Sequence, residues 1–125
     1  MKALEVAVAL VFREGRLFLQ RRDVQARVFP GRWELPGGKL ESGESAERAL
    51  YRELEEELRW TPAEAAALEE LLHAYPERSV RLHPFRCTGP GLLHSGLAWG
   101  WFLPCEARRL ELPGATRALL AGLGG

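Results

Sequence analysis

The sequence predicts a single α+β domain in which strands, a helix, further strands and a last helix follow one another. Two observations support this prediction. A valine-rich apolar stretch opens the chain, and a helix-forming stretch with one apolar face lies in its middle. The length of 125 residues suits one domain with one hydrophobic core, so we expect residues 1–125 to fold as a unit.

The first third of the chain predicts a β-hairpin, a loop and a short strand. Residues 5–12 are rich in valine, which favours a buried strand. A turn signal precedes residues 16–22, which have the pattern of a second strand, so the two strands form a hairpin. Residues 23–33 contain proline and glycine and predict a loop. A short strand at 33–35 then runs into a Pro-Gly-Gly turn.

A helix is predicted from Ser45 to about Arg59. Ser45 is a favourable N-cap, and Glu47 lies in the first turn, where the helix dipole favours a negative charge. Later in the chain, residues 63–72 have helical propensity. Strands and a short last helix complete the prediction, at residues 79–87, 97–103 and 114–123 respectively.

Composition limits the classes of function. Hydrophobic residues make up 46% of the chain and charged residues 27%, which argues against disorder. Lys+Arg and Asp+Glu both number 17, so the chain lacks the broad positive field of a nucleic-acid-binding protein. No apolar run approaches the roughly 20 residues of a membrane span. Cys87 and Cys105 lack metal-type spacing and are expected to be reduced thiols of a cytoplasmic protein.

The predicted helix carries carboxylates on the side that should face the core. On a helical wheel centred on Leu50, Glu57 falls within the apolar arc, Glu53 falls at its edge and Glu56 lies farther round. Burying an unpaired carboxylate costs several kcal/mol or forces its protonation. Such a cluster therefore needs arginines or a hard divalent cation such as Mg²⁺ or Mn²⁺. The alternative is a solvated acidic helix with alternating charges.

The Pro-Gly-Gly turn before this helix adds further groups to the same region. Gly37 and Gly38 let the backbone approach a ligand closely, although a plain turn is the alternative. Their carbonyl groups could also reach a metal ion. Glu41 and Glu44 approach from the loop, and Arg52 can hold a carboxylate through a charge-assisted hydrogen bond.

Together these residues resemble the signature of the Nudix hydrolase family. A glycine opens that signature, a glutamate follows, and an arginine precedes three spaced glutamates. The matching positions here are Gly38, Glu44, Arg52, Glu53, Glu56 and Glu57. The chain departs from the signature at its end, where Arg59 replaces a glycine and Trp60 replaces an aliphatic residue.

The resemblance extends over most of the chain. The stretches LFLQRR, GRWELPGG and HAYPERSVRLHPF look like the MutT-type branch of the family. This resemblance implies an α/β/α sandwich, with a mixed β-sheet between helices. It also implies a strand at about residues 66–75, where propensity alone favours a helix. We follow the resemblance, because tertiary context often overrides propensity.

The resemblance also implies a chemistry and a set of roles. Nudix hydrolases cleave a nucleoside diphosphate linked to another moiety, usually with Mg²⁺. Glu53, Glu56 and Glu57 would then be metal ligands, with the Gly38 carbonyl assisting. Glu53 or Glu56 would activate water. Glu44 and Arg52 would organise the site electrostatically.

Substrate contacts are implied in the same way. Arg22 would bind phosphate and Arg78 would touch a purine, although ordinary surface charge is the alternative for both. Leu35 and Gly37 would lie in the substrate pocket. The base-reading asparagine of the branch aligns with Thr116, which lacks the paired donor and acceptor of an amide.

Two further features of the branch have alternatives here. An additional glutamate of the branch aligns near His94 or Ser95, and His94 could substitute as a base or be plain polar surface. Trp33, Trp99 and Trp101 could stack on a base, but aromatic residues in half-buried strands more often belong to the core.

We therefore expect a Mg²⁺-dependent hydrolase of a nucleoside triphosphate, oxidised or not, with 8-oxo-dGTP as the substrate that the branch suggests. The products would be a monophosphate and pyrophosphate, as in nucleotide-pool sanitation. Alternative substrates are ADP-ribose, a dinucleoside polyphosphate or a pyrimidine triphosphate. A non-catalytic binding module is a further alternative, which is disfavoured because the three glutamates of the signature, Glu53, Glu56 and Glu57, are present. The expected partner is a small nucleotide, without nucleic acid or membrane, and the chain is expected to be a monomer or homodimer.

Overall fold

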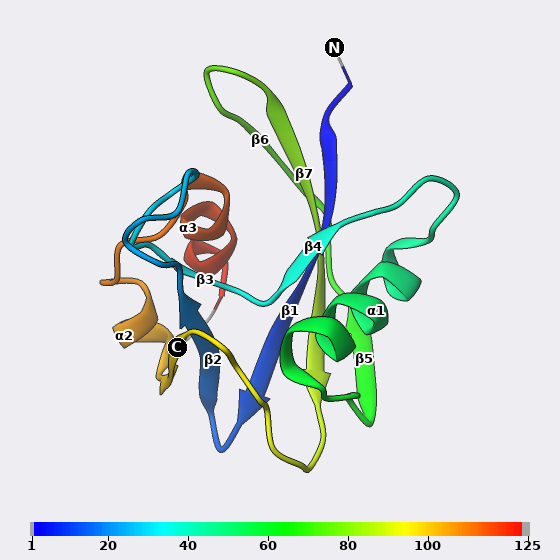
Figure 1. Cartoon of the computed structure of the whole chain (residues 1–125), viewed down its shortest axis with the longest axis vertical. Coiled ribbons are helices and arrows are strands. Elements are labelled where there is room, and N and C mark those ends of the chain that lie inside the picture. Colours follow the sequence, from blue (N-terminus) through cyan, green and yellow to red (C-terminus); the bar gives the residue numbers. More distant parts are fainter. Residues whose placement is uncertain (1, 124–125) are drawn as a thin grey trace.

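The computed structural model describes residues 2–123, which form a mixed β-sheet with helices on both faces (Figure 1). The strands are β1 (Leu4–Arg13), β2 (Arg16–Arg21), β3 (Trp33–Glu34), β4 (Gly37–Lys39), β5 (Glu64–Ala67), β6 (Leu71–Ala74), β7 (Ser79–Thr88) and β8 (Ala98–Phe102). The helices are α1 (Ala46–Leu58), α2 (Pro104–Ala107) and α3 (Gly114–Ala121).

The sheet is mixed because one central pair of strands is parallel. The order along the sheet is β3-β2-β1-β7-β5, with β1 and β7 parallel over the register from Leu4↔Val80 to Val11↔Cys87. The other pairings are antiparallel: β2 lies between β1 and β8, β4 pairs with β1, and β5 and β6 pair with β7. The predicted hairpin and the predicted mixed sheet are thus confirmed.

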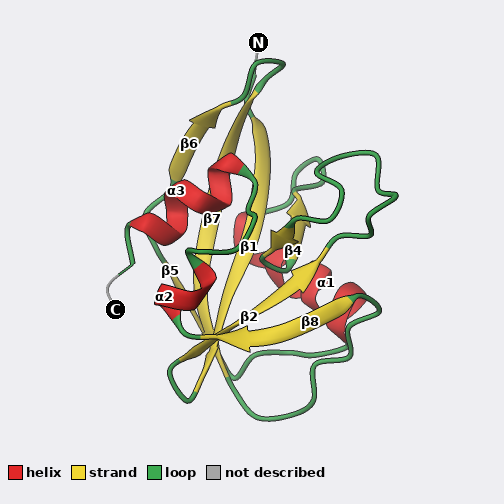
Figure 2. Cartoon of the chain, turned by 90° about the vertical axis from the view of Figure 1, so that its left-hand side faces the viewer, coloured by secondary structure: helices red, strands yellow, loops and turns green. Residues whose placement is uncertain are grey.

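Two hydrophobic cores lie on opposite faces of the sheet. Alternate residues of β1 point to opposite sides, so Ala7 and Ala9 pack towards α1, while Val8 and Leu10 pack towards α3. Leu50, Leu54 and Leu58 of α1 are fully buried, and each such burial contributes about 2 kcal/mol. The layers are therefore helix, sheet and helix: α3 and α1 lie on opposite sides of the strands in Figure 1, and Figure 2 looks onto the sheet with α3 in front and α1 behind. The predicted sandwich is confirmed.

Four segments differ from what local sequence rules favour. Residues 37–39, expected to be a turn and loop, form β4 against β1. A β-carbon at Gly37 would overlap the Ala7 carbonyl oxygen, so the close pairing needs this glycine. Residues 64–67 and 71–74 form strands rather than a helix, because β7 supplies a pairing edge that overrides propensity. The short helix α2 was not predicted.

Helix α1 begins and ends near the predicted positions. Ser45 Oγ accepts the backbone N–H of Arg48 at 3.2 Å, which caps the N-terminus. The helix ends at Leu58, and Arg59 follows it in the left-handed conformation with φ of 49°. Arg59 thus occupies the conformation for which glycine is the usual residue.

Two other expectations can be compared with the structure. Cys87 is a buried free thiol and Cys105 an exposed one, as predicted. Burial raises the pKa of Cys87 to about 12, so this thiol is unreactive. Within residues 2–123, no helix has the length and apolar character that a membrane crossing requires.

Candidate active site

Three glutamates of α1 point to different environments. The side chain of Glu53 is 16% exposed and that of Glu56 is 58% exposed, while Glu57 is partly buried. As the helical wheel predicted, Glu53 and Glu57 face inward and Glu56 faces outward. Because α1 packs its leucines on the sheet, the positions beside them bring Glu53 and Glu57 against β4 and β2.

Glu57 is held by two neutral donors from two different strands. Its Oε2 accepts the backbone N–H of Gly37 at 2.9 Å, and its Oε1 accepts Nε2 of Gln20 at 3.3 Å. Burial raises the pKa of Glu57 to about 7, and the charges of Glu53 and Glu34 act in the same direction. The two groups that hold the Glu57 carboxylate carry no positive charge that would lower its pKa.

Glu53 lies directly against the glycine turn. A β-carbon at Gly38 would overlap the Glu53 carboxylate, so only glycine lets this side chain approach β4. Burial raises the pKa of Glu53, and the charges of Glu56 and Glu44 add to this effect while Arg52 opposes it. The two inward-facing glutamates thus share an excess of negative charge.

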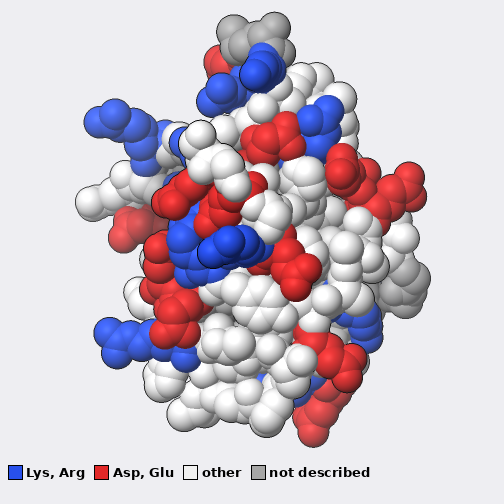
Figure 3. Space-filling view, turned by 90° about the vertical axis from the view of Figure 1, so that its right-hand side faces the viewer, with Lys and Arg blue, Asp and Glu red and all other residues white. Residues whose placement is uncertain are grey.

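Arg52 is the cation at the centre of this acidic group. Its guanidinium donates to Glu44 at 2.8 and 3.0 Å, to the Lys39 carbonyl at 2.9 Å, and to Glu53 and Glu56 at 3.3 Å each. The hydrogen bond from Arg52 lowers the pKa of Glu44 to about 2. Figure 3 shows carboxylates gathered around basic side chains on the face that carries α1.

The donor set suits a hard divalent cation. Carboxylate oxygens and a glycine carbonyl are the ligands that Mg²⁺ and Mn²⁺ prefer, together with water and phosphate oxygens. Burial raises the pKa values of Glu53 and Glu57, and neighbouring glutamate charges add to this, so a cation bound beside them would offset an unfavourable charge. Among the described residues, however, no three acidic, histidine or cysteine side chains already converge as a metal-binding group.

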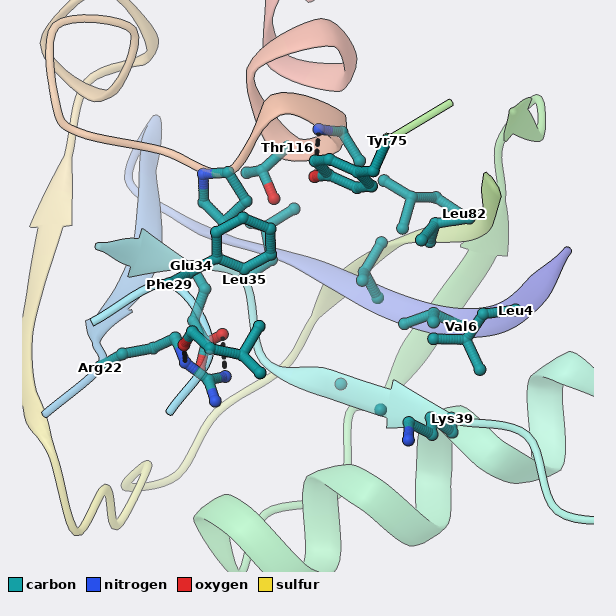
Figure 4. Close-up of a pocket in the computed structure, with 17 residues that line it drawn as sticks. Leu4, Val6, Arg22, Phe29, Glu34, Leu35, Lys39, Tyr75, Leu82 and Thr116 are labelled. Carbon is teal, nitrogen blue, oxygen red and sulfur yellow. Dashed lines mark hydrogen bonds and ion pairs between the residues drawn. The ribbon is translucent and has the colours of Figure 1, made fainter. Parts of the chain in front are cut away.

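A cavity of about 390 Å³ adjoins the acidic group (Figure 4). Apolar side chains from β1, β7 and the segment after β3 line most of it, among them Val6, Val8, Leu35 and Leu82. Gly37 and Gly38 also line this cavity, so the glycine turn is shared with the acidic group. Its size suits a small organic ligand.

Polar groups line the cavity at three places, one of which is Lys39 beside the glycine turn. Arg22 donates to Glu34 at 2.9 Å and to the Val28 carbonyl at 2.7 Å, on the side of the loop after β2 (Figure 4). On the opposite side, the Tyr75 hydroxyl accepts the backbone N–H of Ala115 at 2.7 Å. Thr116 also lines the cavity, and the Phe29 and Tyr75 rings lie 5.5 Å apart at its edge.

The predicted substrate-binding residues divide into two groups. Arg22, Leu35, Gly37 and Thr116 line the cavity. Arg78 is exposed in the turn between β6 and β7 and is not among the lining residues, so its contact with a base stays a prediction.

The tryptophans mainly pack against the sheet. Trp33 meets Phe102 edge to face at 5.1 Å, and Trp101 meets Phe18 in the same way at 5.3 Å. Trp99 stacks on Phe18 at 5.9 Å but remains 51% exposed. The core interpretation therefore holds for Trp33 and Trp101.

Sequence reasoning missed several residues of the site. Gln20 is buried and contacts Glu57, while Glu34, Phe29 and Tyr75 line the cavity. Gln20 carried a readable signal, because it is an amide within an otherwise apolar strand. The other three depend on how the loop after β2 and the β6–β7 hairpin meet, which no local pattern reports.

The chain is similar to proteins of known family in both sequence and structure. Residues 1–116 match the model of the NUDIX domain. The chain is 39% identical over 83 residues to an 8-oxo-dGTP diphosphatase of Escherichia coli, covering 66% of this chain and 64% of that protein. It is 33% identical over 123 residues to an E. coli CTP pyrophosphohydrolase, covering 96% and 90%. A MutT NUDIX hydrolase structure from Burkholderia pseudomallei shares 27% identity and a TM-score of 0.87, covering 99% and 100%.

Proposed function

Because the chain belongs to the Nudix hydrolase family and is an enzyme of its MutT-type branch, we propose that it hydrolyses a nucleoside triphosphate to a monophosphate and pyrophosphate. The observation that carries this proposal is the glycine turn at Gly37 and Gly38, which borders both the acidic group and the cavity. A nucleotide whose base fills the cavity would bring its phosphates to the glutamates of α1.

The divalent cation, Mg²⁺ or Mn²⁺, would be held by Glu53, Glu56, Glu57 and the Gly38 carbonyl. When bound, such a cation neutralises phosphate charge and lowers the pKa of water. Glu53 or Glu56 accepts the proton of the attacking water. Arg52 and Glu44 form an ion pair that keeps the acidic side chains in place.

Substrate binding falls to the residues of the cavity. Arg22 lies at the cavity wall and would exchange its partner Glu34 for a phosphate. Leu35 and Gly37 form the wall next to the acids, and Thr116 lies at the opposite end. Arg78 would reach a purine from the hairpin turn. The enzyme would act on free nucleotides in the cytoplasm, as a monomer or homodimer.

Two nucleobases are candidates for the base of the substrate nucleotide. An oxidised guanine is supported by the likeness to 8-oxo-dGTP diphosphatases. Cytosine is supported by the likeness to a CTP pyrophosphohydrolase over almost the whole chain. The lining side chains of the described cavity include hydroxyls and a carboxylate but no side-chain amide, which favours testing cytidine nucleotides beside purines.

The proposal is tested by phosphate and pyrophosphate release from a nucleotide panel, with and without Mg²⁺. The panel holds 8-oxo-dGTP, dGTP, CTP, dCTP, ADP-ribose and a dinucleoside polyphosphate. Metal-dependent pyrophosphate release from one triphosphate supports the proposal and identifies the base. Preference for ADP-ribose or the dinucleoside compound would replace the substrate class, and no turnover at all would favour a binding module.

Glu53→Gln tests the role of the inward-facing acids. We expect at least about a 100-fold loss in kcat with the fold retained, because a ligand or base is removed. Glu55→Gln is the matched control, since Glu55 is exposed on the same helix. Near-wild-type kcat in Glu53→Gln, or an equal loss in the control, would contradict the assignment.

A further inference from the structure

Gln20 is a buried amide that follows three buried apolar residues of β2, Leu17, Phe18 and Leu19. It lies in β2 with 2% of its surface exposed, on the same side of the sheet as Phe18 and α1. An amide buried in this way is unfavourable unless its donor and acceptor both find partners. Both partners of Gln20 are found, and they connect two parts of the chain that are far apart in sequence.

The two bonds of Gln20 determine which way its amide faces. Its Oε1 accepts the Ser95 hydroxyl at 2.5 Å, and its Nε2 donates to Glu57 at 3.3 Å. Ser95 Oγ also accepts the backbone N–H of Leu97 at 3.1 Å, and its single proton has two acceptors in reach, Gln20 Oε1 at 2.5 Å and the Leu97 carbonyl at 3.3 Å, of which Gln20 is the nearer. An ionised carboxylate only accepts, so the opposite amide orientation would place two acceptors together.

Glu57 is consequently oriented from both sides. The Gly37 N–H binds one of its oxygens and Gln20 binds the other, and each oxygen keeps a further lone pair. Both donors are neutral. They fix the direction of the carboxylate without supplying the positive charge that would compete with a cation, in contrast to Arg52 beside Glu53 and Glu56.

The loop that carries Ser95 is itself fastened to the end of α1. The backbone N–H of His94 donates to the Leu58 carbonyl at 2.8 Å, and Nε1 of Trp60 donates to the Pro90 carbonyl at 2.8 Å. Leu93 packs against the core beneath the helix. The 89–97 loop, Gln20 and Glu57 thus form one connected unit.

We propose that Gln20 is a positioning residue, which together with Ser95 holds the Glu57 carboxylate in the orientation that receives a divalent cation. The inference rests on the proposed function, because it assigns Glu57 to the cation. It gives the 89–97 loop a role through Ser95, at the place where the family resemblance leads one to expect a glutamate. The competing explanation is that Gln20 is only a satisfied core amide.

The test compares Gln20→Met with the wild type in three measurements: Mn²⁺ binding followed by electron paramagnetic resonance without nucleotide, kcat and KM with Mg²⁺, and the melting temperature. Methionine keeps the size of the side chain but removes the donor. We expect Mn²⁺ affinity and kcat to fall roughly tenfold, with KM for the nucleotide unchanged, since supporting contacts to a ligand have effects of this size. Gln25→Met is the control, because Gln25 is the other glutamine and is exposed.

Substitutions of Ser95 test the proposal independently and do not disturb the core. Ser95→Ala should weaken Mn²⁺ binding and kcat in the same direction but less, and Ser95→Thr, which keeps the hydroxyl, should restore both. If Gln20→Met does not fold, the Mn²⁺ binding and kcat of the two Ser95 variants decide whether the proposal stands.

Wild-type Mn²⁺ affinity in folded Gln20→Met, or a change in KM alone, would overturn the inference. If the wild type cleaves no nucleotide, the proposed function fails, while the Mn²⁺ titration still decides the role of Gln20.

Discussion

At the residue scale, Glu57 links burial to the pH dependence of stability. Its pKa is about 7 in the folded protein and about 4.5 in the unfolded chain. Between these values the unfolded chain loses the proton first, so stability is present below about pH 4.5 and is lost as the pH rises towards 7. The contribution of Glu57 should therefore make the metal-free protein less stable at pH 8 than at pH 4.

Glu57→Gln removes this dependence, because glutamine does not titrate. In EDTA, we expect the stability of the variant relative to the wild type to increase by about 3 kcal/mol between pH 4 and pH 8. Urea unfolding at the two pH values measures this difference. If the stability difference between the variant and the wild type is the same at both pH values, Glu57 keeps an ordinary pKa.

At the element scale, the end of α1 departs from the signature and carries strain. Arg59 has a φ of 49°, a conformation that costs a residue with a β-carbon about 1 kcal/mol. Arg59→Gly should raise the free energy of unfolding by about 0.5–1 kcal/mol, measured by urea unfolding. Glu55→Gly, at a helical position of α1, should instead lower it by about 1 kcal/mol. Destabilisation by Arg59→Gly would mean that the arginine side chain stabilises this end.

Helix α3 depends on a contact from another element. It begins after Pro113 with no side-chain cap of its own, and the Tyr75 hydroxyl receives the Ala115 N–H instead. Tyr75→Phe should lower stability by about 1 kcal/mol, because that N–H loses its partner. It should also raise KM for the nucleotide, since both residues line the cavity. Thermal unfolding and initial rates measure the two effects, and an unchanged KM would remove Tyr75 from the binding surface.

At the scale of the whole molecule, the sequence was informative where a pattern is local or long. The hairpin, the capped helix and the inward side of Glu53 and Glu57 follow from spacing along the chain. Strands β5 and β6 were hidden from local propensity, because alanine and glutamate favour a helix until β7 offers an edge. The strand expected at about residues 66–75 came from the family resemblance, and the structure has two short strands there, at Glu64–Ala67 and Leu71–Ala74. Strand β4 was hidden because glycine rarely indicates a strand. The contacts of Gln20, Tyr75 and Arg22 required the assembled sheet.

The charge distribution of the molecule leads to the last prediction. The net charge is zero, yet carboxylates concentrate around α1, where Glu53 and Glu57 both have raised pKa values. A divalent cation bound there stabilises the folded state by RT ln(1 + [M]/Kd), which is about 1.4 kcal/mol at ten times Kd. For a domain of this size, the melting temperature should rise by about 3–6 °C.

The measurement is differential scanning fluorimetry with MgCl₂ and with NaCl at equal ionic strength. The rise should be specific to Mg²⁺, should disappear in a variant carrying both Glu53→Gln and Glu57→Gln, and should persist in Glu55→Gln. An equal rise in NaCl would reduce the effect to general screening of the acidic face. An equal rise in the double variant would move the cation to another part of the molecule.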